Sequence, residues 1–424
     1  MLTKETYLEY INILEDELVP AMGCTEPIAL AYGAAKCREV LGAVPERIEA
    51  HCSGNIIKNV RCVTIPHSHG LCGIEAAVIL GAVGGDCSRS LEVLTSIKED
   101  DVILTQKLLN EGACKVSLLD SHHALHFVLK FFKEDDWAEV EIKSSHTNIT
   151  KIIKNGEVLW DINITSDKKN LDYLKLNLDD IFEFANTFEI NDLKGLLDTQ
   201  IKCNMAIAEE GLMGGYGVGI GKMIRLAYSK GVLTEMKAYA ASASEARMGG
   251  CELPVVVNSG SGNQGIAASV PVIVYVRYLG LSEEKLYRGL AFSNLLTAFQ
   301  KMYIGKLSAF CGAVSAACAA GTALTYLDGG NMTQIQNTIE NTLANIPGII
   351  CDGAKVSCAA KISSALDAAY LAHRMAMQNQ AYKAFTGILQ ESADETISCV
   401  GSIGKDGMKE TDKEILRIML GGKS

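Results

Sequence analysis

The sequence predicts an α+β protein in which a large, mainly helical lobe accompanies a smaller mixed α/β lobe. Three observations support this class. Apolar residues recur with helical spacing at the N-terminus and over most of the second half of the chain, whereas short β-rich segments are confined to residues 45–165. The helical segments are also rich in Ala and Gly, which favours close packing of helices. We therefore expect N-terminal helices in residues 1–44 that join the larger lobe, a mixed lobe in 45–165, and the helical lobe in 166–424.

The N-terminal region predicts two helices. Residues 1–20 repeat apolar side chains every three or four positions, which is typical of an amphipathic helix that ends at Pro20. A second helix is predicted to begin at Thr25-Glu26-Pro27 and to continue to Leu41. Proline is tolerated in the first turn of a helix, and a glutamate there complements the helix dipole.

The middle region alternates strands and helices. Asn155-Gly156 supplies a tight turn, so residues 152–159 are predicted to form a hairpin. The helices expected between the strands cover residues 73–80 and 91–109. The predicted strands are residues 47–52, 60–65, 114–119, 124–132, 138–143 and 150–160.

The second half of the chain repeats the helical period. Its apolar runs at 268–278 and 310–327 are short or rich in small residues, so we interpret them as buried core segments rather than membrane spans. The predicted helices are residues 178–188, 200–208, 282–299, 308–326, 332–343 and 356–377.

Composition limits the partners. The 424 residues carry a net charge of −11, and no basic excess is available to neutralise nucleic-acid phosphates. No signal peptide is visible, and 14 cysteines without one indicate a reducing compartment where thiols stay free or bind metal. We expect a cytoplasmic protein that acts on a small molecule, with no nucleic-acid or membrane partner; a homo-oligomer stays open.

Cys24 lies at the predicted start of the second helix. Unpaired backbone N–H groups and the helix dipole create positive potential there, so we expect the pKa of this thiol to lie below the free value of about 8.5. The same N–H groups are suited to a substrate carboxylate. The alternative interpretation is a small residue that only packs near the helix cap.

Cys311, Cys351 and Cys358 form the second group of candidates. Pro-Gly and Asp-Gly pairs place Cys351 on a tight turn, with Cys358 expected about two turns along the following helix. Three thiols without a CxxC pair suit an iron–sulfur cluster with one open iron better than tetrahedral zinc. Spacing alone leaves plain core cysteines as the alternative.

Other polar segments are less specific. Residues 258–265 and 53–59 are predicted to be polar glycine-rich loops, either ligand-binding segments or simple turns. The glycine run 214–222 is not a phosphate loop, because Tyr216 and Met223 replace required residues. Histidines at 67, 69, 122, 123 and 126 offer a rival zinc site, although HExxH is absent.

Five motifs together resemble the L-cysteine desulfidases, relatives of the iron–sulfur serine dehydratase alpha chain. They are Gly23-Cys24-Thr25-Glu26-Pro27, Ser53-Gly54-Asn55, His146-Thr147-Asn148, Gly262-Asn263-Gln264-Gly265 and Cys351-Asp352-Gly353-Ala354-Lys355. The resemblance covers nearly the whole chain. It implies a [4Fe-4S] cluster held by Cys311, Cys351 and Cys358 in the helical catalytic lobe, with Cys24 as the base.

The resemblance also implies a reaction. An open cluster iron would act as Lewis acid in cleaving L-cysteine to pyruvate, ammonia and sulfide. An L-serine dehydratase using the same cluster is the first alternative, and a non-catalytic iron–sulfur sensor and a zinc protein belong to other classes. The expected substrate contacts are Thr25, Glu26, Asn55, His146, Thr147, Asn148, Asn263, Gln264 and Lys355.

Overall fold

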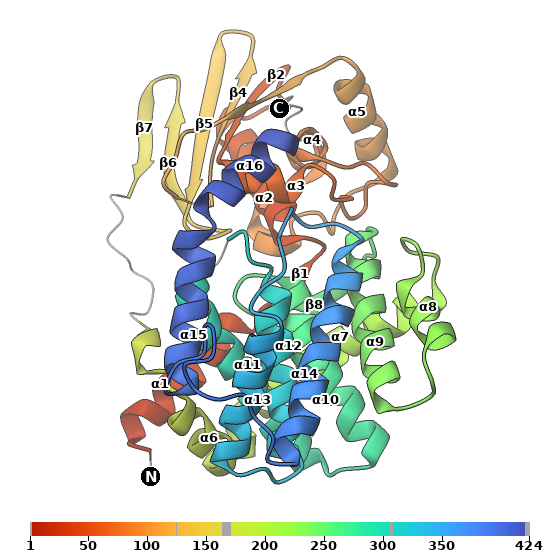
Figure 1. Cartoon of the computed structure of the whole chain (residues 1–424). Helices are drawn as coiled ribbons and strands as arrows, with labels where there is room; N and C mark the ends of the chain where they lie inside the picture. Colours follow the sequence, from red (N-terminus) through yellow and green to blue (C-terminus); the bar gives the residue numbers. More distant parts are fainter. Residues whose placement is uncertain (1, 124, 163–170, 306–307, 420–424) are drawn as a thin grey trace.

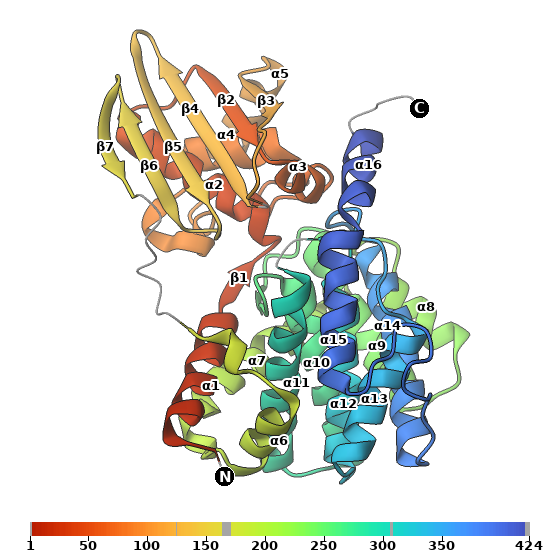
Figure 2. The ribbon, with the colours of Figure 1, turned by 60° about the vertical axis from the view of Figure 1, so that its left-hand side comes forward.

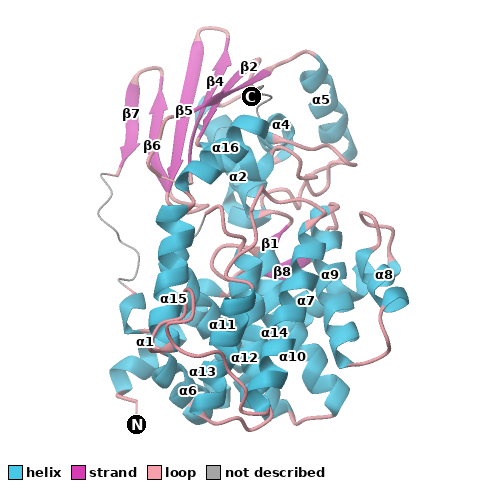
Figure 3. Cartoon of the chain, in the orientation of Figure 1, coloured by secondary structure: helices cyan, strands magenta, loops and turns pink. Residues whose placement is uncertain are grey.

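The computed structural model describes residues 2–123, 125–162, 171–305 and 308–419. It confirms the α+β class: a lobe built on a six-stranded sheet lies above a larger helical lobe (Figures 1 and 3). The expected lobe boundary at 165/166 and the expected strand start at residue 124 lie outside the described residues.

The larger lobe is a bundle of helices around one hydrophobic core. Helices α10, α11 and α12 are prominent in this core, and the apolar and small side chains of α10 and α12 are almost all buried. The elements of this lobe are α1 (Lys4–Glu17), α6 (Leu178–Thr187), α7 (Ile190–Met213), α8 (Ile220–Ala227), α9 (Val232–Met248), β8 (Pro254–Val256), α10 (Gly262–Leu279), α11 (Glu283–Ile304), α12 (Gly312–Leu327), α13 (Met332–Asn345), α14 (Cys358–Met377) and α15 (Ala393–Ser402).

The smaller lobe is a mixed sheet covered on one face by helices (Figure 2). Its strand order is β3-β2-β4-β5-β6-β7, in which β2 and β3 are parallel and the other neighbours antiparallel. The elements are α2 (Thr25–Leu41), β2 (Arg47–Cys52), α3 (Gly54–Val60), α4 (Ile74–Gly84), α5 (Glu99–Asn110), β3 (Cys114–Leu118), β4 (His126–Lys133), β5 (Asp136–Lys143), β6 (Ile149–Lys154) and β7 (Glu157–Asp161).

The strands follow the period of two that a sheet with one covered face requires. In β5, Ala138, Val140 and Ile142 are buried and alternate with more exposed residues. These side chains pack with α2 and α4 in one core. The predicted hairpin is present as β6 and β7, with Asn155-Gly156 at the turn.

The two N-terminal helices belong to different cores. Helix α1 contributes Tyr10, Ile13 and Leu14 to the core of the larger lobe, whereas α2 contributes its apolar residues to the core under the sheet. Between them, the short strand β1 (Pro20–Met22) pairs antiparallel with β8. This crossing places the start of α2 at the junction of the lobes.

The C-terminal helix makes a second crossing. Helix α16 (Lys409–Met419) follows α15 and lies beside α3 (Figure 2). Leu416 packs so closely on Gly54 that a Cβ there would lie 2.5 Å from its Cδ2. Lys58 of α3 also forms an ion pair with Asp412 of α16. The position of α3 is therefore tied to the end of the chain.

Three sequence predictions need correction. Residues 60–65 are not a strand: α3 ends there in a turn, and only Thr64 bridges to Cys72. The expected helix 91–109 is interrupted: α5 begins afresh at Glu99, where Asp101 in the first turn accepts the backbone N–H of Lys98 at 2.9 Å. The helix expected from residue 308 begins only at Gly312.

Residues 268–276 and 313–325 are buried core, as predicted, whereas Tyr278 at the end of the first segment is exposed. Among the described helices, none combines the length and apolar character needed to cross a membrane.

Candidate active site

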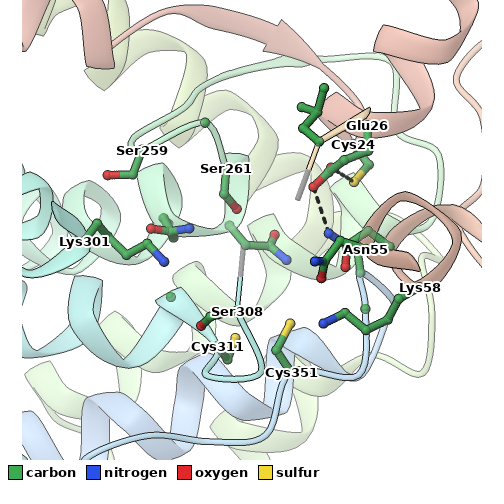
Figure 4. Close-up of a pocket in the computed structure, with 18 of the residues that line it drawn as sticks. Cys24, Glu26, Asn55, Lys58, Ser259, Ser261, Lys301, Ser308, Cys311 and Cys351 are labelled. Carbon is green, nitrogen blue, oxygen red and sulfur yellow. Dashed lines mark hydrogen bonds between the residues drawn. The ribbon is translucent and has the colours of Figure 1, made fainter. Parts of the chain in front are cut away.

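A cavity of about 360 Å³ lies where the two lobes meet. Figure 4 shows side chains entering it from the α2–α3 side and from the helical lobe. It brings together residues that are up to several hundred positions apart in the sequence. The predicted site residues that line it are Cys24, Glu26, Asn55, His146, Asn263, Gln264, Cys311, Cys351 and Cys358.

Four long helices begin at this cavity. Cys24, Ser261 and Cys311 are the N-cap residues of α2, α10 and α12, and Cys358 is the first residue of α14. None of these helix starts has a side-chain cap hydrogen bond. Their first N–H groups and dipoles therefore give the cavity positive potential, which favours thiolates and anionic ligands.

Cys24 occupies the predicted helix cap, but the pKa of its thiol is not lowered as expected. The residue is only 2% exposed, and burial raises the pKa of its thiol well above the ordinary value, with a further contribution from the Glu26 charge. Arg247 offsets part of this effect. The expectation of a lowered pKa is therefore wrong: burial and a neighbouring carboxylate outweigh the helix dipole, and the free protein holds a neutral thiol.

Glu26 is the hydrogen-bond acceptor for this thiol. The Sγ of Cys24 donates to Oε2 of Glu26 at 3.1 Å, and Nδ2 of Asn59 donates to Oε1 at 3.1 Å (Figure 4). Burial opposes ionisation of Glu26, but His146, the Cys24 thiol and Arg247 outweigh it and lower the pKa of the carboxyl. The pair is therefore a neutral thiol that donates to a carboxylate.

Arg247 positions the Cys24 segment. Its side chain is 2% exposed, and Nε donates to the carbonyl oxygen of Gly23 at 2.8 Å. Thr25 contributes from the other side, since its Oγ1 donates to the carbonyl oxygen of Gly260 at 2.9 Å and lies 3.2 Å from Glu26 Oε2. These contacts hold the start of α2 against the loop before α10.

Cys311 and Cys351 are placed by two adjacent loops. The N–H of Cys311 donates to the carbonyl of Ile349 at 2.8 Å, and the N–H of Cys351 donates to that of Ala309 at 2.7 Å. Gly353 then has φ +94°, and a Cβ on it would lie 2.2 Å from the backbone oxygen of Lys58. Only glycine allows this turn to approach α3 so closely.

Cys358 differs from its predicted position. It opens α14 instead of lying two turns inside a helix, because residues 354–357 form bends and a turn before the helix begins. The side chain is 6% exposed and lines the cavity together with the other two cysteines.

The Cys311 and Cys351 thiols are close enough to shift each other's pKa. This contact lowers the pKa of Cys351 to about 6 despite burial, with help from Lys58, the Gly353 N–H and Lys361. The same contact and burial raise the pKa of Cys311, and burial raises that of Cys358. Cys351 is thus the thiol of the three that most readily becomes a thiolate.

The three thiols fit a polynuclear cluster as a donor set. Within the described ranges, no group of three or more His, Cys, Asp or Glu side chains is arranged to hold a single metal ion. A cluster makes a different demand, because its cysteines bind different iron atoms. Three cysteines around one cavity, with a fourth cysteine hydrogen-bonded to Glu26, match a cluster that keeps one iron open.

Two buried amide oxygens face the same cavity and have no hydrogen-bond partner among the residues that the structure describes. They are Oδ1 of Asn55 and Oε1 of Gln264. Because unpaired buried polar atoms are costly, such acceptors indicate a ligand with donor groups. An ammonium group supplies donors of this kind.

Four predicted contacts do not line this cavity. Thr25 is buried and bonds to Gly260 as described, and Asn148 donates to the carbonyl of Lys143 at 2.9 Å, which stabilises its own turn. Thr147 lines a neighbouring cavity. Lys355 is directed to Asp352, with which it forms an ion pair. In this structure the four residues lie in or behind the cavity walls, and their contacts with substrate stay predictions.

Several charged residues that line the cavity were not predicted from the sequence. Lys58 lies in the polar segment 53–59, so the composition of that segment offered a signal. Arg247 and Lys301 are surrounded in sequence by helical core patterns, and nothing local distinguishes them. The histidines 122 and 123 also line the cavity, beside His146.

Comparison with known proteins defines the class to which this site belongs. The sequence model of the family described as the serine dehydratase alpha chain matches residues 88–417. The chain belongs to this family, and membership supports a lyase-type function.

Similar proteins, each named a UPF0597 protein, occur in Lachnoclostridium phytofermentans, Desulfitobacterium hafniense and Finegoldia magna. They are 46%, 47% and 44% identical to this chain, over 98%, 98% and 97% of its length. The matches cover 100%, 97% and 99% of those proteins.

Proposed function

We propose that the protein is a [4Fe-4S]-dependent lyase that cleaves L-cysteine to pyruvate, ammonia and sulfide. The observation that carries this proposal is the shared cavity of Cys24, Cys311, Cys351 and Cys358. Cys311, Cys351 and Cys358 would hold the cluster, and Cys24 would serve as the base. When bound, the cluster supplies an open iron that acts as a Lewis acid on the substrate.

The chain's own residues account for the proton transfers. Glu26 accepts the proton of the Cys24 thiol across the 3.1 Å hydrogen bond, and the resulting thiolate takes the proton from the substrate Cα. The electron pair of the C–H bond forms a Cα–Cβ double bond as the Cβ–S bond breaks and sulfide departs. The aminoacrylate product tautomerises and is hydrolysed to pyruvate and ammonia.

Polar groups on the cavity walls are suited to hold an amino acid. The amide oxygens of Asn55 and Gln264 accept hydrogen bonds from the substrate ammonium group. Asn263 bonds to Ser244 Oγ at 3.1 Å and reaches the cavity from the first turn of α10, beside Gln264. His146 lowers the pKa of Glu26 and lines the same wall. These contacts orient the Cα hydrogen toward Cys24.

L-Serine dehydration is the second candidate. The family description favours it directly, and the same residues would act with hydroxide as the leaving group. A soft sulfur leaving group has the stronger affinity for iron, so L-cysteine is the substrate we propose.

The test is anaerobic reconstitution with iron and sulfide, followed by assays of L-cysteine and L-serine. We expect equal amounts of sulfide and pyruvate from L-cysteine at a higher kcat/KM than pyruvate from L-serine. Pyruvate from L-serine without sulfide from L-cysteine would identify a serine dehydratase. A reconstituted cluster without turnover of either amino acid would favour the non-catalytic sensor. Zinc without iron would exclude both lyases.

A further inference from the structure

Lys301 is a buried lysine that the proton-transfer scheme does not use. It lies in the last turn of α11, is 4% exposed, and lines the cavity (Figure 4). In the part of the chain that the structure describes, no side chain or carbonyl forms a hydrogen bond or ion pair with its ammonium group. A buried charge without a partner is costly, so its retention at a cavity indicates a ligand.

The other buried lysines that the structure describes have partners. Lys237 is 1% exposed and donates to both oxygens of Asp367, at 2.8 and 2.7 Å. Lys58 is paired with Asp412. Glu17, which lies near Lys301, already accepts the Ser259 N–H and the Tyr173 hydroxyl, each at 2.6 Å. Among the described lysines that line the cavity, Lys301 is therefore the one that forms no ion pair with a carboxylate.

Helix starts add to the positive charge around Lys301. The 16-residue α12 begins at Cys311, and the 18-residue α10 begins at Ser261, both at this cavity and both without a side-chain cap. Their N–H groups and the Lys301 ammonium together form a setting for an anion.

We infer that Lys301 binds the carboxylate of the α-amino acid substrate. This inference rests on the proposed function and adds the residue that selects for a carboxylate. Figure 4 shows Lys301 and Cys24 entering the cavity from different walls. With the carboxylate at Lys301 and the ammonium at Asn55 and Gln264, the Cα lies between the two contacts, and its hydrogen can be directed to Cys24.

The test compares ligands that differ only in the carboxylate. L-Alanine and L-alaninamide lack a β-leaving group, so their binding to the reconstituted holoenzyme is measured by calorimetry without turnover. The variants are Lys301→Met, Lys301→Arg and the matched buried-lysine control Lys237→Met. Iron content and the thermal unfolding midpoint are measured for each.

We expect Lys301→Met to weaken L-alanine binding about 100-fold and to leave L-alaninamide within about twofold. KM for L-cysteine should rise with a smaller change in kcat, and Lys301→Arg should recover part of the L-alanine affinity. Lys237→Met should leave the preference for L-alanine over L-alaninamide unchanged. Iron content should be that of the wild type, and removal of an unpaired buried charge should not lower the unfolding midpoint of Lys301→Met.

Equal weakening of both ligands would overturn the inference, because Lys301 would then contact another part of the substrate. Loss of iron from both Lys301 variants would also overturn it and place the lysine with the cluster thiols. The inference would also be overturned if the wild type bound neither L-alanine nor L-alaninamide, or bound both equally. Failure of the proposed function would look different. The wild type would then bind L-alanine in preference to L-alaninamide but turn over neither L-cysteine nor L-serine.

Discussion

The thiol of Cys24 donates a hydrogen bond to the carboxylate of Glu26, two residues later in the chain, at 3.1 Å. Both residues lie in the first turn of α2, one at the cap and one inside the helix. The contact joins a thiol whose pKa is raised by burial to a carboxyl whose pKa is lowered. In this contact the proton therefore lies on Cys24, and the Glu26 carboxylate accepts the hydrogen bond.

The first prediction concerns Glu26→Gln. The amide keeps the shape of the side chain but is a much weaker proton acceptor, so kcat for L-cysteine should fall about 100-fold or more while iron content stays constant. Steady-state kinetics of the reconstituted variant measure this. Glu340→Gln, which changes a half-buried glutamate of α13 away from the cavity, is the control. An unchanged kcat in Glu26→Gln would exclude Glu26 from the proton transfer.

The second prediction separates the base from the cluster ligands. Cys24→Ser should retain the iron and the brown absorbance but lose about 100-fold or more of the activity, because a hydroxyl is a far weaker acid than a thiol. The control is Cys62→Ser, at an exposed position outside the cavity. Loss of the absorbance in Cys24→Ser would instead make Cys24 a ligand.

The sequence specified this helix start well. Cys24 is the N-cap as predicted, because Glu26 complements the dipole in a first turn and Pro27 is tolerated there but not in the helix interior. The pKa of Cys24 was mispredicted for a definite reason. The helix dipole can be inferred from residues 24–41, but the burial of the thiol depends on Val63, Met248 and other residues far along the chain.

The cavity is formed by residues far apart in the sequence, so it could not be predicted from local sequence patterns. The spacing of Cys311, Cys351 and Cys358 did not determine that they meet, and the family resemblance supplied that expectation. Asn263 and Gln264 were assigned to a loop, whereas they lie in the first turn of α10. Lys301 has no local signal, since a lysine near a helix C-terminus is ordinarily a solvated residue.

The third prediction concerns the packing of α2 on α4. A Cβ on Gly81 would lie 2.3 Å from the backbone oxygen of Ala31, so Gly81→Ala should destabilise the protein by about 2 kcal/mol despite its better helix propensity. Urea unfolding measures the change. Gly195→Ala in α7 is the matched control, because no atom lies within 4 Å of its Cβ position. That variant should gain about 0.5–1 kcal/mol. Equal effects of the two variants would contradict the close approach.

The fourth prediction concerns pH. Burial lowers the pKa of His373 to about 4, although Asp328 opposes the shift. The unfolded chain binds a proton at about pH 6.5 and the folded chain only near pH 4, so this group's contribution to stability is present above pH 6.5 and is lost as the pH falls between those values.

The comparison for this prediction is His373→Gln. Between pH 7 and pH 5 the wild type should lose about 2 kcal/mol more stability than the variant, measured by urea unfolding. Parallel losses in the two proteins would show that His373 titrates alike in both states.

The most direct test of the central claim is the iron and inorganic sulfide content of anaerobically reconstituted protein. Wild type and Cys318→Ser should each bind about four iron and four sulfide per chain, because Cys318 is a buried core residue of α12 outside the cavity. Cys351→Ser should lose the cluster and the activity together. Wild type without iron, or Cys351→Ser with a full cluster, would contradict the account.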